Sequence, residues 1–306
     1  MSEPRYIKRV NVSSIHDFIR CRQRWLFTWY LNRVPRDKPH ALEFGTLLHE
    51  VFETYFKAEG KLTMEESALA NITPEYIKSG GQSSLSLAER DLLYYLPVLA
   101  HWAEQYPVEA TMEVEAPFEY PIPGRDGQVL VGRPDRVVKV WGRLYHMQNR
   151  GLDEKKNLAL YTELGMRNMH ELTYAWALKR KYPDEEYGGT IYNLLRKVTL
   201  QNRKGEDKFK PPYRELLGQK MVPMLSPRIE HAINKVAYFA AEMERTVGLY
   251  EAGATIGDSD LMDGGFYGNS KDPYFDVLIG KKSIMDNRYF TDREDPYAKQ
   301  SHPDAR

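Results

Sequence analysis

The chain has 306 residues, of which 42% are hydrophobic, and its 43 Lys and Arg residues balance 43 Asp and Glu residues. This length suffices for one large α/β domain, with or without a helical insertion and a C-terminal appendage. Balanced charge argues neither for nor against a nucleic-acid partner, so any basic groove has to be local. No stretch approaches the roughly 20 apolar residues of a membrane span, and the N-terminal segment is charged and aromatic; we therefore expect a cytoplasmic protein.

Cys21 is the single cysteine. One cysteine excludes an internal disulfide, a multi-cysteine zinc site and an iron–sulfur cluster held by four cysteines of one chain. Metal chemistry in this chain would therefore use oxygen and imidazole ligands, and we expect Cys21 to be a half-buried free thiol.

Apolar residues recur at helical spacing in the N-terminal third of the chain. The sequence predicts helices over 14–33 and 45–57, a polar loop over about 58–87, and a helix over about 87–106. Ser13 and Ser14 are candidate N-caps of the first helix, which should bury one face and present Arg22 and Arg24 elsewhere.

From Met112 the pattern changes to short alternating runs that are typical of strands. The sequence predicts mostly antiparallel strands over 112–120, 128–140 and 143–150, a helix over about 158–182, a strand over 189–197, an irregular basic loop, a helix over about 227–250, and a Gly/Asp/Tyr-rich tail. These elements together predict an α/β fold.

Polar residues mark four of these elements. The second helix begins Gly45-Thr46 and places His49 and Glu53 four residues apart on one face. The second strand carries Gly132-Arg133-Pro134-Asp135, and the third strand ends at Gln148-Asn149-Arg150. The helix that follows carries His170 and Tyr174 on a shared face.

This order, over about residues 11–200, resembles the RecB-like exonuclease branch (phage and CRISPR-associated type) of the PD-(D/E)XK nuclease superfamily. That branch carries a Gly-Thr-x-x-His-x-x-x-Glu helix, a Gly-x-x-Asp strand, an acidic-x-Lys strand and a Gln-x-x-x-Tyr helix. The resemblance implies a restriction-endonuclease-like core, with a mixed central sheet flanked by helices, in a domain over 1–250 with a helical insertion over about 58–110. Residues 251–306 would form a C-terminal appendage.

The resemblance also implies a divalent-metal-dependent DNA nuclease, acting as an exonuclease on ends or single strands. The motif specifies phosphodiester chemistry and not the polymer, so RNA stays open as a substrate. Such hydrolysis needs the phosphate neutralised and a water activated, which Mg²⁺ or Mn²⁺ held by carboxylates accomplishes. By resemblance Asp135 is the leading metal ligand and His49 completes the set, with imidazole favouring Mn²⁺. Glu53 would orient His49 or touch metal-bound water.

Two positions depart from the family pattern. Gln148 and Arg150 stand where the acidic residue and the lysine are expected. Gln148 could ligate metal through its carbonyl oxygen but brings no charge, so metal affinity should fall. Arg150 could stabilise a developing phosphorane charge, but it cannot lose its proton to act as a base. A weakened domain that binds nucleic acid or a protein partner without cutting is therefore the alternative.

His170 replaces the glutamine of the helix motif, and with Tyr174 it could reach a phosphate or base, although an aromatic residue at helical spacing is often core. An acidic-x-Lys triplet does occur at Glu154-Lys155-Lys156, but its surroundings predict a loop. Arg22, Arg24, Lys155 and Lys156 could line a phosphate-binding groove, or could simply be solvated surface. Some relatives place the first cysteine of an iron–sulfur cluster near the position of Cys21; because the later cysteines are missing, we expect no cluster.

Overall fold

The computed structural model describes residues 7–36, 40–72, 85–105, 111–153, 169–197, 216–224, 226–254, 285 and 290–292. The chain divides into two compact units. The first contains residues 1–38, 121–129 and 235–306, and the second contains residues 39–120 and 130–234.

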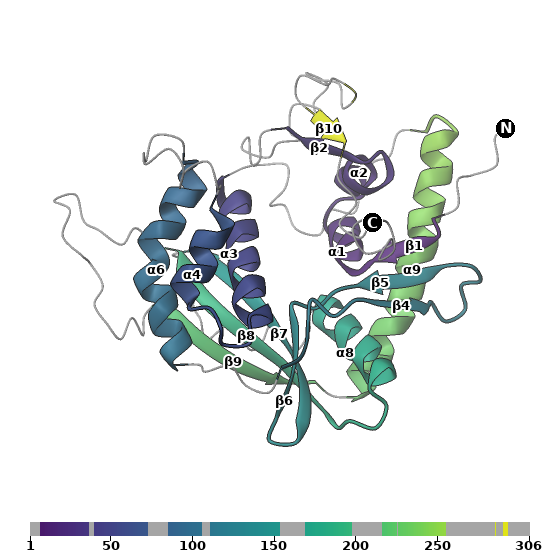
Figure 1. The fold of residues 1–306 in the computed structure, drawn as a ribbon. Coiled ribbons are helices and arrows are strands. Elements are labelled where there is room, and N and C mark those ends of the chain that lie inside the picture. Colours follow the sequence, from purple (N-terminus) through teal and green to yellow (C-terminus); the bar gives the residue numbers. More distant parts are fainter. Residues whose placement is uncertain are drawn as a thin grey trace, which may run out of the picture. The chain divides into compact units, whose positions relative to one another are not determined.

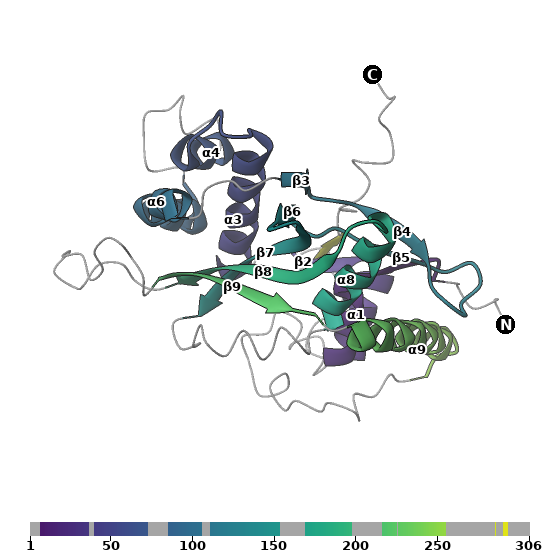
Figure 2. The same ribbon diagram turned by 90° about the horizontal axis from the view of Figure 1, so that it is seen from below.

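A mixed sheet of five strands, in the order β3-β6-β7-β8-β9, is the centre of the second unit (Figures 1 and 2). Its strands are β3 (Thr111–Val114), β6 (Arg136–Val140), β7 (Arg143–Asp153), β8 (Tyr187–Lys197) and β9 (Leu217–Pro223). The β7–β8 pair is parallel, whereas the other neighbours are antiparallel. A parallel pair needs a crossover connection, and helix α8 (Met169–Lys181) lies within the segment that joins these two strands.

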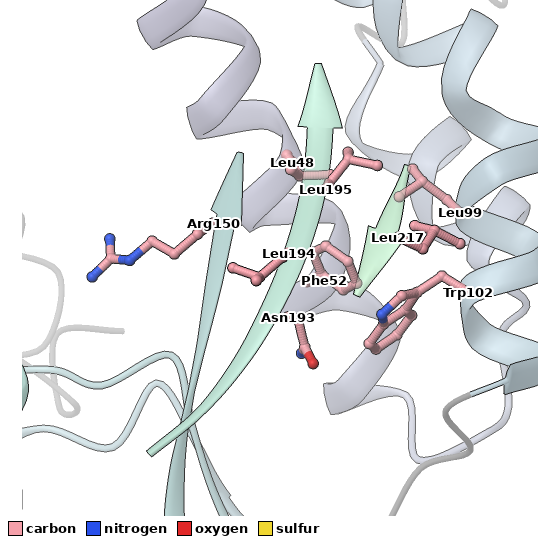
Figure 3. Close-up of a pocket in the computed structure, with 9 residues that line it drawn as sticks. All are labelled: Leu48, Phe52, Leu99, Trp102, Arg150, Asn193, Leu194, Leu195 and Leu217. Atoms are coloured by element: carbon pink, nitrogen blue, oxygen red, sulfur yellow. The ribbon is translucent and has the colours of Figure 1, made fainter. Parts of the chain in front are cut away.

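Three helices cover one face of this sheet: α3 (His40–Lys57), α4 (Met64–Asn71) and α6 (Leu87–Gln105) (Figure 1). Their apolar residues form one core with Leu195 and Leu217 of the sheet. The Phe52 and Trp102 rings meet edge to face at 4.9 Å. The cavity among these side chains, shown in Figure 3, measures about 10 Å³, so it holds at most one water. The side chains around this cavity are therefore packed core.

Helix α8 covers the other face. Leu178 of α8 packs with Val137 of β6 and Leu144 of β7. Because side chains alternate along a strand, His146, Gln148 and Arg150 point to the same face as Leu144. Asn149 points to the opposite face, where its side-chain oxygen accepts a hydrogen bond from Asn193 of β8 at 3.0 Å.

The first unit contains most of the long helix α9 and several short elements. They are β1 (Arg9–Asn11), α1 (Val12–Arg20), α2 (Arg22–Trp25), the π-helix η1 (Leu26–Tyr30), β2 (Arg33–Pro35), α9 (Ser226–Glu251) and β10 (Phe290–Asp292). Strands β2 and β10 pair antiparallel. Two ion pairs reach α9, one from Arg125 to Glu244 and one from Arg22 to Glu242 at 3.3 Å.

The prediction of one continuous helix over 14–33 is wrong. Cys21 has extended backbone angles, with φ −162° and ψ 109°, and it separates α1 from α2. Its Sγ accepts a hydrogen bond from the N–H of Arg24 at 3.3 Å, so the thiol caps α2 and is fully buried rather than half-buried. The N-cap of α1 is Asn11, and not Ser13 or Ser14.

Two predicted strands are each split in two. The run 112–120 forms β3 and β4 (Phe118–Pro121), and it breaks at Glu115, whose φ is +53°. The run 128–140 forms β5 (Val129–Gly132) and β6, separated by a segment that contains Pro134, which cannot donate a ladder hydrogen bond.

The predicted loop 58–87 contains α4, which begins with a complete capping box between Thr63 and Glu66. Strand β9 lies within the region predicted as an irregular basic loop, so this part of the prediction is wrong. Of the helix predicted over 158–182 only the part from Met169 is described, and most of the predicted C-terminal tail lies outside the described residues. Among the described helices none is long and apolar enough to cross a membrane.

Candidate active site

His49 of α3 and Asp135, directly before β6, form the pair predicted from their motifs. His49 Nδ1 lies 3.3 Å from Asp135 Oδ2. The charge of Asp135 raises the pKa of His49 above its ordinary value, against the effect of burial. Burial by itself would raise the pKa of Asp135, but the charges of His49 and Arg150 and the N–H of Asn149 outweigh it and lower that pKa. Asp135 therefore stays ionised and available to a cation.

Two backbone hydrogen bonds fix the position of Asp135. The N–H of Asn149 donates to Oδ2 of Asp135 at 2.7 Å, and the N–H of Glu115 donates to its backbone oxygen at 2.8 Å. The aspartate is thus tied to β7 on one side and to the end of β3 on the other.

The Gly-x-x-Asp motif owes its glycine to close packing. A Cβ at Gly132 would lie 2.5 Å from the Phe118 ring and 2.9 Å from the Tyr174 ring. Tyr174 is 5% exposed, and its hydroxyl donates to the backbone oxygen of Arg133 at 3.2 Å. Tyr174 therefore packs in the core and supports the segment that leads into Asp135.

Gln148 and Arg150 share the α8 face of β7. Arg136 pairs with Met147, so the preceding Asp135 lies beside Gln148 at the start of β6. Gln148 is 2% exposed, and its Nε2 has no hydrogen-bond partner among the described residues. In Figure 3 the side chain of Arg150 extends away from the apolar residues of α3 and α6.

Glu115 is a carboxylate of this site that the sequence analysis missed. Its Oε2 lies 2.5 Å from Arg133 Nε. Burial, with the nearby charges of Asp135 and Glu53, raises its pKa to about 7, against the charge of Arg133. The sequence signal is weak, because Glu115 occupies an alternating run in which a carboxylate normally faces solvent.

Glu53 forms an ion pair with Lys57, one helical turn further along α3. Its predicted contact with His49 or with metal-bound water stays a prediction. His170 packs edge to face on Tyr174 at 4.5 Å, and its Nδ1 lies 3.6 Å from Glu171 Oε1. Glu171 is fully buried and was not predicted as a site residue.

The four predicted nucleic-acid contacts are not brought together among the described residues. Arg22 and Arg24 belong to the first unit, where the Arg22 guanidinium lies 5.3 Å from the Phe18 ring centre. Lys155 and Lys156 lie outside the described residues, as does the alternative ligand Glu154.

The side chains of His49, Asp135 and Gln148 are the candidate ligands for a divalent ion. Within the described residues, no three His, Cys, Asp or Glu side chains gather as a metal-ligand set. His49 and Asp135 supply imidazole and carboxylate, and the amide oxygen of Gln148 beside them could add a third donor. The Gln148 atom that lacks a partner among the described residues is Nε2, an N–H donor that does not bind a cation. Oxygen and imidazole donors suit Mg²⁺ or Mn²⁺, which complete their coordination with water and phosphate oxygens, so these residues fit such an ion.

Comparison with known proteins shows the family. The family model described as the PD-(D/E)XK nuclease superfamily matches residues 9–247. The chain therefore belongs to the PD-(D/E)XK nuclease superfamily, whose members generally use divalent metals, and the fold class predicted from the sequence is confirmed.

Two solved structures are similar to this chain. One is named "Putative exonuclease", from Eubacterium rectale; it is 8% identical, with 79% of this chain and 82% of that chain covered, at a TM-score of 0.45. The other, SSO0001, is 13% identical, with 79% of each chain covered, at a TM-score of 0.34. No curated protein matches the sequence.

Proposed function

We propose that the chain is a divalent-metal-dependent DNA nuclease of the RecB-like branch, which hydrolyses phosphodiester bonds as an exonuclease at ends or on single strands. The observation that carries the proposal is the pairing of His49 with an ionised, backbone-clamped Asp135 beside Gln148 and Arg150. These are the side chains of three separate motifs, in the family's order, and they lie on α3, directly before β6 and within β7.

Asp135, His49 and the carbonyl oxygen of Gln148 would hold the metal ion. Bound there, a divalent ion would neutralise the phosphate and lower the pKa of an attacking water. Glu115 adds a second acidic group beside Asp135, and so supplies part of the negative charge that Gln148 lacks. Arg150 would donate to the phosphate as its charge develops. Tyr174 would act by holding the backbone before Asp135.

The test measures cleavage of labelled single-stranded and double-stranded DNA, with Mg²⁺, with Mn²⁺ and with a chelator. Asp135→Asn should abolish metal-dependent cleavage with the fold intact, because the amide keeps the shape and removes the ligand charge. His49→Ala should reduce cleavage strongly. Asp184→Asn, on an exposed turn, and His101→Ala, on α6, are matched controls that should cut like the wild type.

Each result of these cleavage assays tests a different part of the proposal. Full activity of the Asp135→Asn variant would show that Asp135 is not a metal ligand. A His49→Ala variant that loses only thermal stability would make His49 a core residue. A folded wild type that cuts neither DNA nor RNA would refute the nuclease proposal, and a domain that binds nucleic acid or protein without cutting would replace it.

A further inference from the structure

A fully buried carboxylate lies behind Arg150. Glu171 of α8 and His146 of β7 are both 0% exposed. Glu171 uses both oxygens: Oε1 accepts from Arg150 Nη2 at 3.2 Å, and Oε2 lies 2.8 Å from His146 Nε2. The other ring nitrogen of His146 lies 2.7 Å from the Tyr187 hydroxyl, and Thr190 Oγ1 is 3.1 Å from Nε2. The network therefore joins β7, α8 and β8.

The charges within this network fix the direction of its hydrogen bonds. Burial by itself would raise the pKa of Glu171. The hydrogen bond from His146, followed by the closeness of His170 at 3.6 Å and the charge of Arg150, outweighs burial and holds that pKa well below its ordinary value. The carboxylate can only accept, so Nε2 of His146 donates to Oε2 of Glu171. Burial raises the pKa of the Tyr187 hydroxyl well above its ordinary value, so this donor keeps its proton.

Arg150 lies between two carboxylates of different exposure. Its charge helps to lower the pKa of both Asp135 and Glu171. The Arg150 side chain is 29% exposed, whereas that of Glu171 is 0% exposed. The guanidinium is therefore anchored from inside the protein and reaches solvent beside Asp135. A planar guanidinium can bind a carboxylate and a phosphate at once in fixed directions, which the point charge of a lysine ammonium cannot do.

We propose that Glu171 is a positioning residue for Arg150. Its Oε1 orients the guanidinium toward the phosphate of a nucleic-acid substrate, and His146 holds the carboxylate in place. Arg150 and Glu171 then act together. Where the family has a lysine, this chain has an arginine that pairs with a buried carboxylate on α8. The inference rests on the proposed function, because it requires a nucleic-acid phosphate at this site.

A double-mutant cycle tests the proposal. Glu171→Gln and Arg150→Lys are made singly and together, and each variant is titrated against a fluorescein-labelled oligothymidylate with the divalent metal chelated. Single-turnover cleavage is then measured with Mn²⁺. Each single variant should bind about tenfold more weakly, since a displaced or altered charged contact costs on the order of 1.4 kcal/mol. The double variant should bind no more weakly than Arg150→Lys, because Glu171 acts only through the guanidinium.

Glu113→Gln is the matched control. Glu113 of β3 also binds the C-terminal end of α8, where it lies 2.5 Å from Lys181 Nζ and accepts a hydrogen bond from the hydroxyl of the next residue, Tyr182, at 2.6 Å. No hydrogen bond or ion pair joins it to Arg150 among the described residues. This variant should bind and cut like the wild type. If Glu171→Gln does not fold, Glu171→Asp takes its place in the cycle; it keeps the charge and withdraws the carboxylate from Arg150, and the same tenfold loss is expected.

Wild-type binding by the Glu171 variant would overturn the proposal, as would additive losses in the double variant, which would mark a structural role alone. These results differ from a failure of the proposed function. In that case the folded wild type itself would neither bind nor cut the oligonucleotide, and the inference would fall with it.

Discussion

Replacing Gly132 by alanine tests the packing that positions Asp135. The added Cβ would lie 2.5 Å and 2.8 Å from two atoms of the Phe118 ring and 2.9 Å from the Tyr174 ring. Carbon atoms in contact normally lie about 3.5–4.0 Å apart, so the neighbours have to move by about 1 Å. Both rings are buried, and they meet edge to face at 5.9 Å, so neither can swing into solvent.

Overpacking of this kind costs about 1–3 kcal/mol, and with two rings displaced we expect a value near the upper end. For a unit of this size such a loss lowers the melting temperature by about 5–10 °C. Urea unfolding followed by circular dichroism would measure the free energy of unfolding, and a calorimeter would measure the melting temperature. Metal-dependent cleavage should fall as well, because Tyr174 also holds the backbone before Asp135.

The chain offers a glycine control and a rescue. A Cβ at Gly45, within α3, would meet nothing within 4 Å, so Gly45→Ala should stabilise the protein by up to about 1 kcal/mol. Phe118→Leu removes the closest ring atoms, so it should cost less in the Gly132→Ala background than in the wild type. If the Gly132→Ala variant has the same free energy of unfolding and the same cleavage rate as the wild type, the close packing inferred for the motif glycine is refuted.

Three further predictions concern the site itself. Gln148→Glu should tighten Mn²⁺ binding measured by calorimetry and raise the cleavage rate, because it adds the missing ligand charge and leaves Arg150 in place; a rate that falls instead would show a site built around glutamine. The pKa of Glu115 is raised from 4.5 to about 7, so the folded protein binds this proton more tightly than the unfolded chain and loses stability as pH rises through that interval. Glu115→Gln removes this loss. The free energy of unfolding of the variant minus that of the wild type, measured with urea, should therefore be larger near about pH 8 than near about pH 5. Equal differences at the two pH values would contradict the raised pKa. Tyr174→Phe leaves the ring in place and removes the hydrogen bond to Arg133, so the free energy of unfolding should fall by about 1 kcal/mol and cleavage should fall in part, because the backbone before Asp135 is held less firmly. A complete loss of cleavage would show that the hydroxyl acts directly.

The sequence predicted those parts of the site whose residue pattern is local. His49 and Asp135 were identified from motifs of a few residues each, and the structure brings them together. Tyr174 and Gly132 were predicted in the same way, although only the structure shows that they pack against each other. The predicted sheet was incomplete because strand β9 has little alternation and follows a long polar segment.

The remaining features depend on contacts between distant segments. Glu115 joins the site because the chain turns at a positive φ, which nothing in the residue type indicates. A glutamate in a helix with several charged residues is normally expected to face solvent. In the structure Glu171 is buried, and its carboxylate pairs with His146 and Arg150 of β7. The break at Cys21 likewise depends on a thiol capping a helix, which is a role rarely read from a sequence.

The parallel pairing of β7 with β8 has a consequence for how the chain acquires its site during folding. Arg150 and Glu171 are 21 residues apart and close a loop within a single strand-helix-strand segment, whereas His49 and Asp135 come from segments much further apart. Each doubling of loop length costs only about 0.6 kcal/mol in closure entropy, but contacts between distant segments slow folding. The Arg150–Glu171 pair is therefore encoded by one contiguous stretch of sequence, and the His49–Asp135 pair forms only when the long-range topology of the second unit is complete.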